Sequence, residues 1–359
     1  METFTLGSDM GDSLTIREVA QIAGVSIATV SRAVNRSGPV SREARDAINR
    51  AIEQSGFRPN NIGRQLKTAR THTIGVLVPS LKNPIFADAL TGLEDTAGKA
   101  GYNVLLAASG YCAEKEVSAV ETFLRSRVEG MVLTVADETR SRALDILGTS
   151  GIPYVLLFNP AGRVDVSSVS VDNRLAAYQL VESLIGLGHE RITMIAGRLS
   201  ESDRSVERQA GYLRALNNHG LPEGDIVEVG FENPDLASRV AELEQRRHPP
   251  SAYFCSTDML AIAMIRALSA LGKRVPDDAS VVGFDGIAIG EHLTPSLATA
   301  VQPAEAMGDW AARHLLARIV SGESIVHQVF PHRIRSGESR GLPGRAFRRA
   351  NSGKSSDMP

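Results

Sequence analysis

The stretch "VSIATVSRAVN", from Val25 to Asn35, decides how the first part of this 359-residue chain folds. It follows a glycine, carries one charged side chain, Arg32, and begins with residues that are small or short and polar. Apolar residues recur in it at the spacing of one helical face. We therefore expect a short helix that buries one side and leaves the other open. The residues expected to face inward are Val30, Ala33 and Val34.

Two further helices are expected around this one. Thr15 and Glu18 have the spacing of a capping box, which predicts a helix start, and a glycine ends that helix before Val25. Ser26 is expected to cap the second helix, and the third follows Ser41. The expected core residues of the flanking helices are Ile16, Val19, Ala20, Ala23, Ala44, Ile48 and either Ile52 or Ala51.

A helix, a glycine-containing turn and a second helix are typical of a helix-turn-helix motif. A helix that enters the major groove of DNA needs small residues at its leading end and no acids, since acids repel phosphate. Arg32 can reach O6 and N7 of guanine, and Asn35 can reach a base or a phosphate. A three-helix structural domain with a polar face remains the alternative. We expect the DNA-binding domain to span residues 14–58, after an extension over 1–13 that we expect to be disordered.

The charge pattern also favours a polyanionic partner for this head. Residues 15–70 contain ten Lys and Arg against four Asp and Glu, whereas residues 71–339 contain 24 against 33. A basic head on an acidic body indicates that the head meets a polyanion such as DNA.

Residues 59–70 are expected to form a linker or a short hinge helix. Pro59 ends the preceding helix, and Asn60 can cap a new one. Leu66 is an isolated apolar residue among the basic residues Arg64 and Lys67. As a hinge on DNA, the leucine can wedge into the minor groove while the basic side chains hold phosphates.

From Thr73 onward, β-rich apolar runs alternate with helical segments, which predicts parallel sheets buried on both faces. About 270 residues are too many for one open sheet, so we expect two doubly wound lobes. Ligands of such folds bind at the carboxyl ends of the strands. The body is expected over residues 71–339, with one lobe over about 71–160 and 290–320 and the other over about 161–289 and 321–339. Residues 340–359 are expected to form a mobile basic tail.

No catalytic, cofactor or metal motif is present. The chain lacks GxGxxG, GxxxxGK[ST] and HExxH sequences, and Cys112 and Cys255 form no CxxC pair. We interpret Cys255 as a buried structural residue and His189 as part of a helix–strand junction. No secretory signal or apolar run of membrane-spanning length occurs, so we expect a cytoplasmic protein that needs no cofactor and contacts no membrane.

The order of these sequence segments along the chain resembles that of the lactose/galactose repressor (LacI/GalR) family of bacterial transcription regulators. The resemblance covers roughly residues 14–339 and rests on several segments in a shared order. They include "TIREVAQIAGVSIATVSRAVN", "GFRPNNIGRQLKT", "TIGVLVPSLKNPIFADALTGLE", "ERQAGYLRAL" and "STDMLAIAMIRALSALGKRVPDDASVVGFDG". It implies a small all-α helix-turn-helix domain joined to an α/β two-lobed domain like the periplasmic sugar receptors.

The resemblance also implies a homodimer whose two heads read a near-palindromic operator. The positions that match the family's base readers are Ile27, Ala28 and Arg32. Its phosphate-facing positions match Thr15, Ser26, Thr29, Ser31 and Asn35, and the hinge leucine that wedges into the operator centre matches Leu66. One departure is Gly63, where the family usually has alanine, so the hinge helix is expected to form more weakly.

In the body, the resemblance implies a small effector, a sugar or a sugar derivative, bound between the lobes. The matching positions are Asn83, Ile85, Phe86, Arg208, Thr257, Asp258 and Asp285. Structural alternatives remain open: Phe86 as core, Arg208 in a salt bridge, and Asp258 or Asp285 as a cap. For Asp172 we favour a helix cap over a ligand contact. Thr257 and Gly286 depart from the family's usual residues, so no particular sugar is transferred.

The function implied is that of a repressor of carbohydrate-metabolism genes whose operator affinity the effector controls. An activator or a dual regulator of the same family is the alternative. A sugar-binding sensor or transport protein is a rival, but such a protein would not carry the DNA-binding domain. An enzyme acting in the cleft is a second rival, and turnover of a bound ligand would support it.

Overall fold

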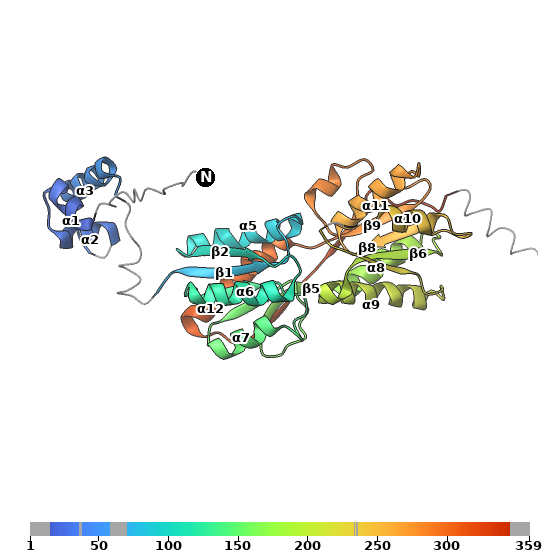
Figure 1. The fold of residues 1–359 in the computed structure, drawn as a ribbon, viewed down its shortest axis with the longest axis horizontal. Coiled ribbons are helices and arrows are strands. Elements are labelled where there is room, and N and C mark those ends of the chain that lie inside the picture. Colours follow the sequence, from blue (N-terminus) through green and yellow to red (C-terminus); the bar gives the residue numbers. More distant parts are fainter. Residues whose placement is uncertain (1–14, 36–37, 58–69, 233, 235, 345–359) are drawn as a thin grey trace, which may run out of the picture. The chain divides into compact units, whose positions relative to one another are not determined.

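The computed structural model describes residues 15–35, 38–57, 70–232, 234 and 236–344. Contacts divide the chain into two compact units, residues 1–70 and 71–359 (Figure 1), and each is described here by itself. The predicted hinge residues Asn60, Arg64, Leu66 and Lys67 lie outside the described residues, as do Gly63, the N-terminal extension and residues 345–359.

The first unit consists of three short helices. They are α1 (Ile16–Ala23), α2 (Ile27–Asn35) and α3 (Arg42–Ser55). Their core contains Val19, Ala20, Val30, Ile48, Ala51 and Phe57, with Ala33, Val34 and Ile52 packed against it. The sequence predicted all of these except Phe57, and Ala44, which it placed inside, is only half-buried.

The helix ends follow the predicted capping residues. The carboxylate of Glu18 accepts hydrogen bonds from the backbone N–H and the hydroxyl of Thr15. The hydroxyl of Ser26 accepts from Thr29 N (3.1 Å), and that of Ser41 accepts from Ala44 N (3.2 Å). These short polar side chains therefore start the helices by satisfying N–H groups that have no partner within the helix.

The second unit contains two parallel sheets of six strands each. The first sheet has the order β2-β1-β3-β4-β5-β11 and is parallel throughout. Its strands are β1 (Thr73–Val78), β2 (Asn103–Ala108), β3 (Gly130–Leu133), β4 (Tyr154–Leu157), β5 (Ser167–Val171) and β11 (His327–Phe330).

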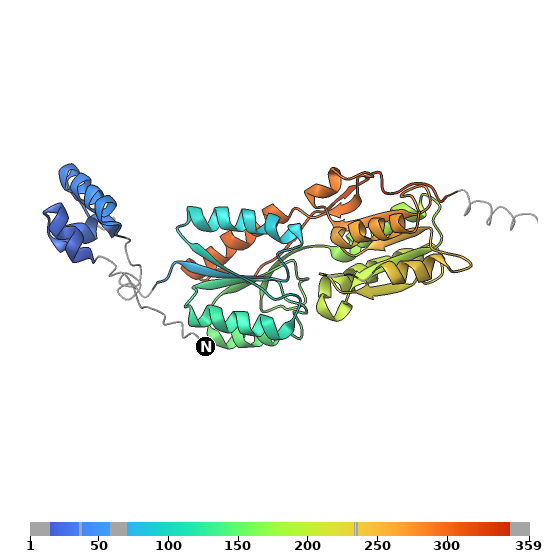
Figure 2. The ribbon, with the colours of Figure 1, turned by 45° about the horizontal axis from the view of Figure 1, so that its top comes forward.

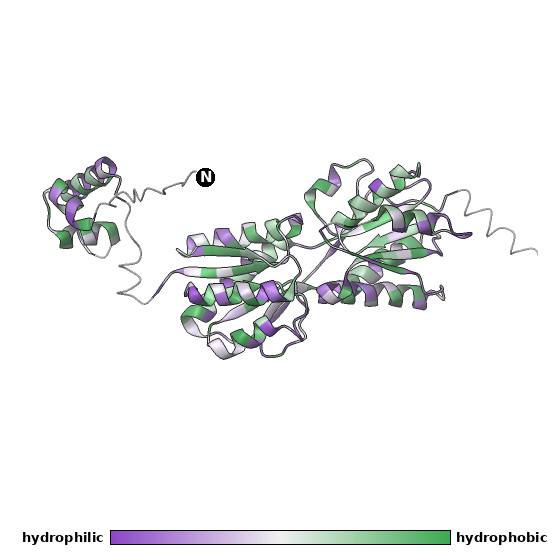
Figure 3. Cartoon of the chain, in the orientation of Figure 1, coloured by the Kyte–Doolittle hydropathy of each residue, from purple (hydrophilic) through white to green (hydrophobic). Residues whose placement is uncertain are grey.

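Helices cover both faces of this first sheet. Val76 faces a core with α5 (Pro84–Lys99) and α12 (Ala304–Ser321), whereas the next residue, Leu77, faces α6 (Ala113–Arg125) and α7 (Arg142–Ser150). Figure 2 shows α5 and α6 on opposite sides of the strands. In Figure 3 the strands are mostly green, as expected for strands that are buried on both faces.

The second sheet also has six strands, in the order β7-β6-β8-β9-β10-β12, and only its edge strand β12 is antiparallel. Its strands are β6 (Ile192–Gly197), β7 (Ile226–Val229), β8 (Ala252–Cys255), β9 (Ser280–Asp285), β10 (Ala298–Val301) and β12 (Arg333–Arg335). The helices α8 (Asn173–Ile185) and α9 (Asp203–Asn218) cover one face, and α10 (Ala237–Glu244) and α11 (Asp258–Ala270) cover the other.

The predicted boundaries of the lobes were wrong at three strands. Residues 167–171, expected in the second lobe, form β5, which pairs with β4 in the first sheet, and β11 joins the same sheet beside β5. Residues 298–301, expected in the first lobe, form β10, which pairs with β9 in the second sheet. The chain therefore crosses between the lobes after β5, after β10 and after β11 in the described part of the body.

No helix within the described residues is long and apolar enough to cross a membrane.

Candidate functional site: a DNA-facing helix and an interlobe cleft

The open side of α2 carries the residues expected to read DNA. Ile27 is 43% exposed, and Ala28 and Arg32 are also exposed. Thr15 and Ser26 are exposed at the helix starts, while Thr29 and Ser31 are half-buried. The backbone of Asn35 ends α2, but its side chain lies outside the described residues.

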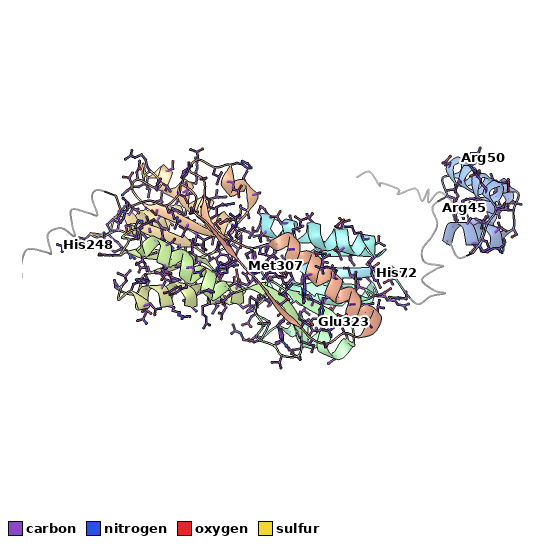
Figure 4. All side chains as sticks on the ribbon, turned by 180° about the vertical axis from the view of Figure 1, so that it is seen from behind. Arg45, Arg50, His72, His248, Met307 and Glu323 are labelled. Carbon is purple, nitrogen blue, oxygen red and sulfur yellow. The ribbon has the colours of Figure 1, made fainter. Side chains whose placement is uncertain are left out.

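Arg32 lies along its own helix in this structure. Its Nε donates to Ala28 O and its Nη2 to Thr29 Oγ1, both at the long distance of 3.4 Å. Such weak bonds within one turn leave the guanidinium free to swing toward a base edge. Arg45 and Arg50 are exposed on α3 (Figure 4) and offer further positive charge for phosphates.

The second candidate site is a cleft between the two lobes of the body. Every element that lines it follows the carboxyl end of a strand, which is where ligands of doubly wound folds bind. The cavity has a volume of about 20 Å³, within about 330 Å³ of atom-free space that includes open solvent. It is lined by Asn83, Ile85, Phe86, Tyr111, Phe158, Ser202, Arg204, Ser205, Arg208, Phe231, Thr257, Asp285 and Gln302.

Of the seven predicted effector residues, all of which the structure describes, six line this pocket. The exception is Asp258, which corrects the prediction. Its buried carboxylate accepts from Gly286 N (2.8 Å), Ile287 N (2.8 Å) and Thr299 Oγ1 (2.6 Å). Burial raises the pKa of Asp258 to about 7. Asp258 therefore ties β9, β10 and α11 together and has no oxygen directed at the cleft.

Asp285 is the polar centre of the cleft. Its carboxylate, 3% exposed, accepts from Asn83 Nδ2 across the cleft (2.9 Å) and from Gln302 Nε2 (3.0 Å). Arg208 Nη1 lies 3.4 Å from the same carboxylate. Burial raises the pKa of Asp285, and the Arg208 guanidinium opposes that rise. The bond from Asn83 joins the lobes directly.

Arg208 is held from three sides. Its Nε donates to Asn173 Oδ1 (2.9 Å), its Nη1 donates to the carbonyl of Ser256, and its guanidinium lies 3.7 Å from the ring centre of Phe284. Burial lowers the pKa of Arg208 to about 10, although Asp285 opposes this shift. The salt bridge that the sequence left open as an alternative is present, yet the same side chain also lines the pocket.

Aromatic rings form the apolar walls. Phe86 and Phe158 meet edge to face with ring centres 5.6 Å apart, and Tyr111 from the first lobe stacks on Phe231 from the second at 4.1 Å. Rings of this kind suit the apolar face of a sugar or a base. Phe86 is only 5% exposed, so it belongs both to the core and to the cleft.

Several residues of this cleft have strained backbone conformations with a positive φ angle. Among the described non-glycine residues, five have a positive φ, and three of them line the pocket: Tyr111 (60°), Phe158 (71°) and Asp285 (127°). Each such conformation costs about 1–3 kcal/mol and persists only where the surroundings impose it. Here it turns side chains at strand ends into the cleft.

Thr257 and Gly286, the two departures noted in the sequence, have separate roles. Thr257 lines the pocket and caps α11 by accepting from Leu260 N (3.2 Å). Gly286 has φ 82°, and a Cβ there would lie 2.5 Å from Val301 Cα. Gly286 therefore shapes the turn after β9 and is not among the residues that line the cleft.

The remaining interpretations from the sequence concern structural residues. Asp172 caps α8 by accepting from Leu175 N (2.8 Å), as favoured. His189 is buried between the hydroxyls of Ser251 (2.9 Å) and Ser280 (3.0 Å), and Cys255 is fully buried. In the described part of the chain, no group of His, Cys, Asp and Glu residues has the arrangement of a metal site.

Sequence reasoning missed seven residues of the cleft. Gln302 and Phe158 directly follow strands, and Arg204 lies one helical turn before Arg208 on α9, so position alone was a usable signal for these three. The others occupy loops or helix starts without a distinctive pattern. The missed residues are Tyr111, Phe158, Ser202, Arg204, Ser205, Phe231 and Gln302.

Comparison with known proteins agrees with this architecture. Residues 15–60 match the family model of bacterial regulatory proteins of the lacI family, and residues 71–336 match that of periplasmic binding proteins and the sugar-binding domain of the LacI family. The chain is 36% identical over 318 residues to the HTH-type transcriptional regulator GntR of Escherichia coli K12, covering 88% of this chain and 94% of that protein.

Solved structures of transcriptional regulators are also similar to this chain. The transcriptional regulator CelR in complex with cellobiose is 31% identical with a TM-score of 0.68, covering 91% of this chain and 99% of that one. The lac repressor dimer bound to operator and the anti-inducer ONPF is 25% identical with a TM-score of 0.80, covering 92% and 100%. The chain belongs to the LacI family of DNA-binding transcriptional regulators, which are not enzymes.

Proposed function

We propose that this protein is a repressor of carbohydrate-metabolism genes whose affinity for its operator is set by a small sugar-like effector in the cleft. The observation that supports effector control best is the contact between the lobes at the cleft. Asn83 bonds Asp285 across it, and Ser80 and Lys82 of the first lobe bond Glu232 of the second (3.0 and 2.9 Å). A ligand that replaces or adds to these contacts changes the relative stability of the lobe arrangements.

DNA binding divides into two contributions in this proposal. Lysine and arginine contacts supply salt-sensitive affinity for any DNA, and α2 supplies sequence choice through Ile27, Ala28 and Arg32. Leu66 wedges into the operator centre while Arg64 and Lys67 hold phosphates. The effector acts through its different affinity for the DNA-binding and the released arrangement.

We further propose that the protein acts as a homodimer on a near-palindromic operator in the cytoplasm. The solved lac repressor relative is a dimer bound to operator, which supports this assembly. Two heads related by a two-fold axis match two half-sites related by the symmetry of the DNA.

The experiment uses the purified full chain. An operator is selected from random DNA, and its affinity is measured with and without sugars, sugar acids, sugar phosphates, polyols and nucleosides. Arg208→Ala serves as the cleft variant. We expect at least one compound to change the affinity of the wild type and not that of the variant. A footprint that overlaps a promoter supports repression, whereas one upstream of the promoter would favour an activator.

A further inference from the structure

Two polar groups in the cleft are buried and have no partner within the described chain. Arg204, 4% exposed, donates through Nη1 to Val135 O (2.8 Å) and to Asp203 Oδ1 (3.0 Å), but its Nη2 bonds nothing. The hydroxyl of Ser205, 1% exposed, also has no partner. Both residues line the pocket.

Several acceptors of the cleft, by contrast, already take part in hydrogen bonds. The carboxylate oxygens of Asp285 accept hydrogen bonds from Asn83, Gln302 and Arg208. The hydroxyl of Ser202 accepts from Ser205 N (3.3 Å), and that of Thr257 accepts from Leu260 N. Arg204 Nη2 can only donate, and the Ser205 hydroxyl can donate as well as accept. A buried donor without a partner costs about 1–3 kcal/mol, so these two groups fit a ligand that brings acceptors.

The charges of the cleft favour the same kind of ligand. Among the described residues that line it, Arg204 and Arg208 carry positive charge and Asp285 alone carries negative charge. The two arginines are four residues apart on α9 and so share one helical face. Arg204 is paired with Asp203 on one side, and a carboxylate or a phosphate matches the geometry of the guanidinium edge that Nη2 leaves open.

We propose that the effector carries an anionic group, a carboxylate or a phosphate, which accepts from Arg204 Nη2 and from the Ser205 hydroxyl. Arg204 is then the residue that selects an acidic sugar over the neutral sugar of the same size. This inference rests on the proposed function, namely that a small polyhydroxylated ligand occupies the cleft. The aromatic walls formed by Phe86 and Phe158 receive the uncharged part of the ligand.

The test is a thermal-unfolding screen of the full chain with matched compounds. Five- and six-carbon sugars are each paired with the aldonic acid made from them and with their phosphate ester. We expect an acid or an ester to raise Tm by about 5 °C at a concentration of about 100 times Kd, and the parent sugar to have no effect. The acid and ester arms tell a carboxylate from a phosphate.

Three variants locate the effect. Arg204→Gln should abolish the rise in Tm produced by the acid or ester. Ser205→Ala removes an oxygen that bonds nothing else, so it should fold normally and weaken binding about tenfold. Arg214→Gln removes the same charge from an exposed position on the same helix and should leave the rise unchanged.

The outcomes separate this inference from the proposed function. If only neutral sugars raise Tm, and Arg208→Ala loses that rise, the cleft binds a sugar and the inference is overturned alone. If an acid raises Tm equally in Arg204→Gln and Ser205→Ala, the inference is also overturned. If no compound raises Tm, the anionic effector is rejected, and operator binding still tests the proposed function separately.

Discussion

Arg32 is the one charged residue in the sequence of α2, and it stands on the open face of that helix. Replacing it with alanine should lower affinity for the selected operator by about 1–3 kcal/mol, since a bidentate arginine–guanine pair is worth that much. Affinity for unrelated DNA should fall far less.

Arg50→Ala is the matched control, because it removes an equally exposed arginine from α3 (Figure 4). Fluorescence anisotropy with operator and with scrambled DNA measures both variants. Equal losses on the two DNAs in Arg32→Ala would mean that Arg32 contacts only phosphate.

Glu116 is a buried carboxyl on α6 whose pKa burial raises to about 7, although the N–H of Ala136 donates to it at 2.8 Å and lowers it. In the unfolded chain its pKa is near 4.5. The folded state therefore binds the extra proton between these values, and the stability contributed by this group falls as pH rises from 4.5 to 7.

We expect Glu116→Gln to remove that pH dependence. Relative to the wild type, the unfolding free energy of the variant should rise by about 2 kcal/mol between pH 5 and pH 8. Urea unfolding at several pH values measures the difference. A difference that stays constant with pH would contradict the raised pKa. The other buried groups titrate in both proteins and cancel in this comparison.

The pair of helices α5 and α12 depends on glycines at their crossing. A Cβ at Gly92 would lie 2.0 Å from Glu305 O, whereas a Cβ at Gly98, on the same helix, meets nothing within 4 Å. Gly92→Ala must therefore push α5 and α12 apart and should cost about 1–3 kcal/mol or more. Gly98→Ala should stabilise by up to about 1 kcal/mol. Urea unfolding of both variants checks the contrast, and equal effects would argue against this helix contact.

The hinge helix is an element that the sequence predicts outside the described residues. Glycine costs about 1 kcal/mol in a helix relative to alanine, so Gly63→Ala should favour the hinge helix and tighten operator binding by about fivefold. Anisotropy with the selected operator measures the change. Unchanged or weaker binding would show that Gly63 does not limit hinge formation.

The strands that the sequence predicted are those with continuous apolar runs, such as β1 and β6. The strand β5 was missed because three of its five residues are serines, all buried. The hydroxyl of Ser167 is satisfied by Arg318 (2.9 Å) and by Val326 N (3.1 Å), and Ser168 pairs with His327 (3.0 Å). Those partners lie about 150 residues away in sequence, so no local pattern reveals them.

At the scale of the whole molecule, the architecture follows from alternation, charge and shared motif order, but the cleft does not. Asp258 follows β8 and Asp285 ends β9, which is its neighbour in the same sheet. Nevertheless, Asp258 accepts hydrogen bonds from the turn after β9, whereas Asp285 faces the ligand site. Arg204 stands one helical turn before Arg208, but only the folded chain shows that it is buried and that its Nη2 has no partner. Such roles depend on which donors and acceptors remain unused after folding.

Under the proposed function, a ligand in the cleft sets the affinity of the head for DNA. The most direct measurement is the Kd of the full chain for its selected operator, with and without each sugar, acid and ester of the matched panel at about 10 mM, high enough to saturate sites of ordinary affinity. We expect at least one compound to change Kd by at least about tenfold, or 1.4 kcal/mol of coupling, and we expect this change to be lost in Arg208→Ala. A compound that raises Tm through the cleft but leaves Kd unchanged would contradict the claim, because binding without differential affinity shifts no equilibrium.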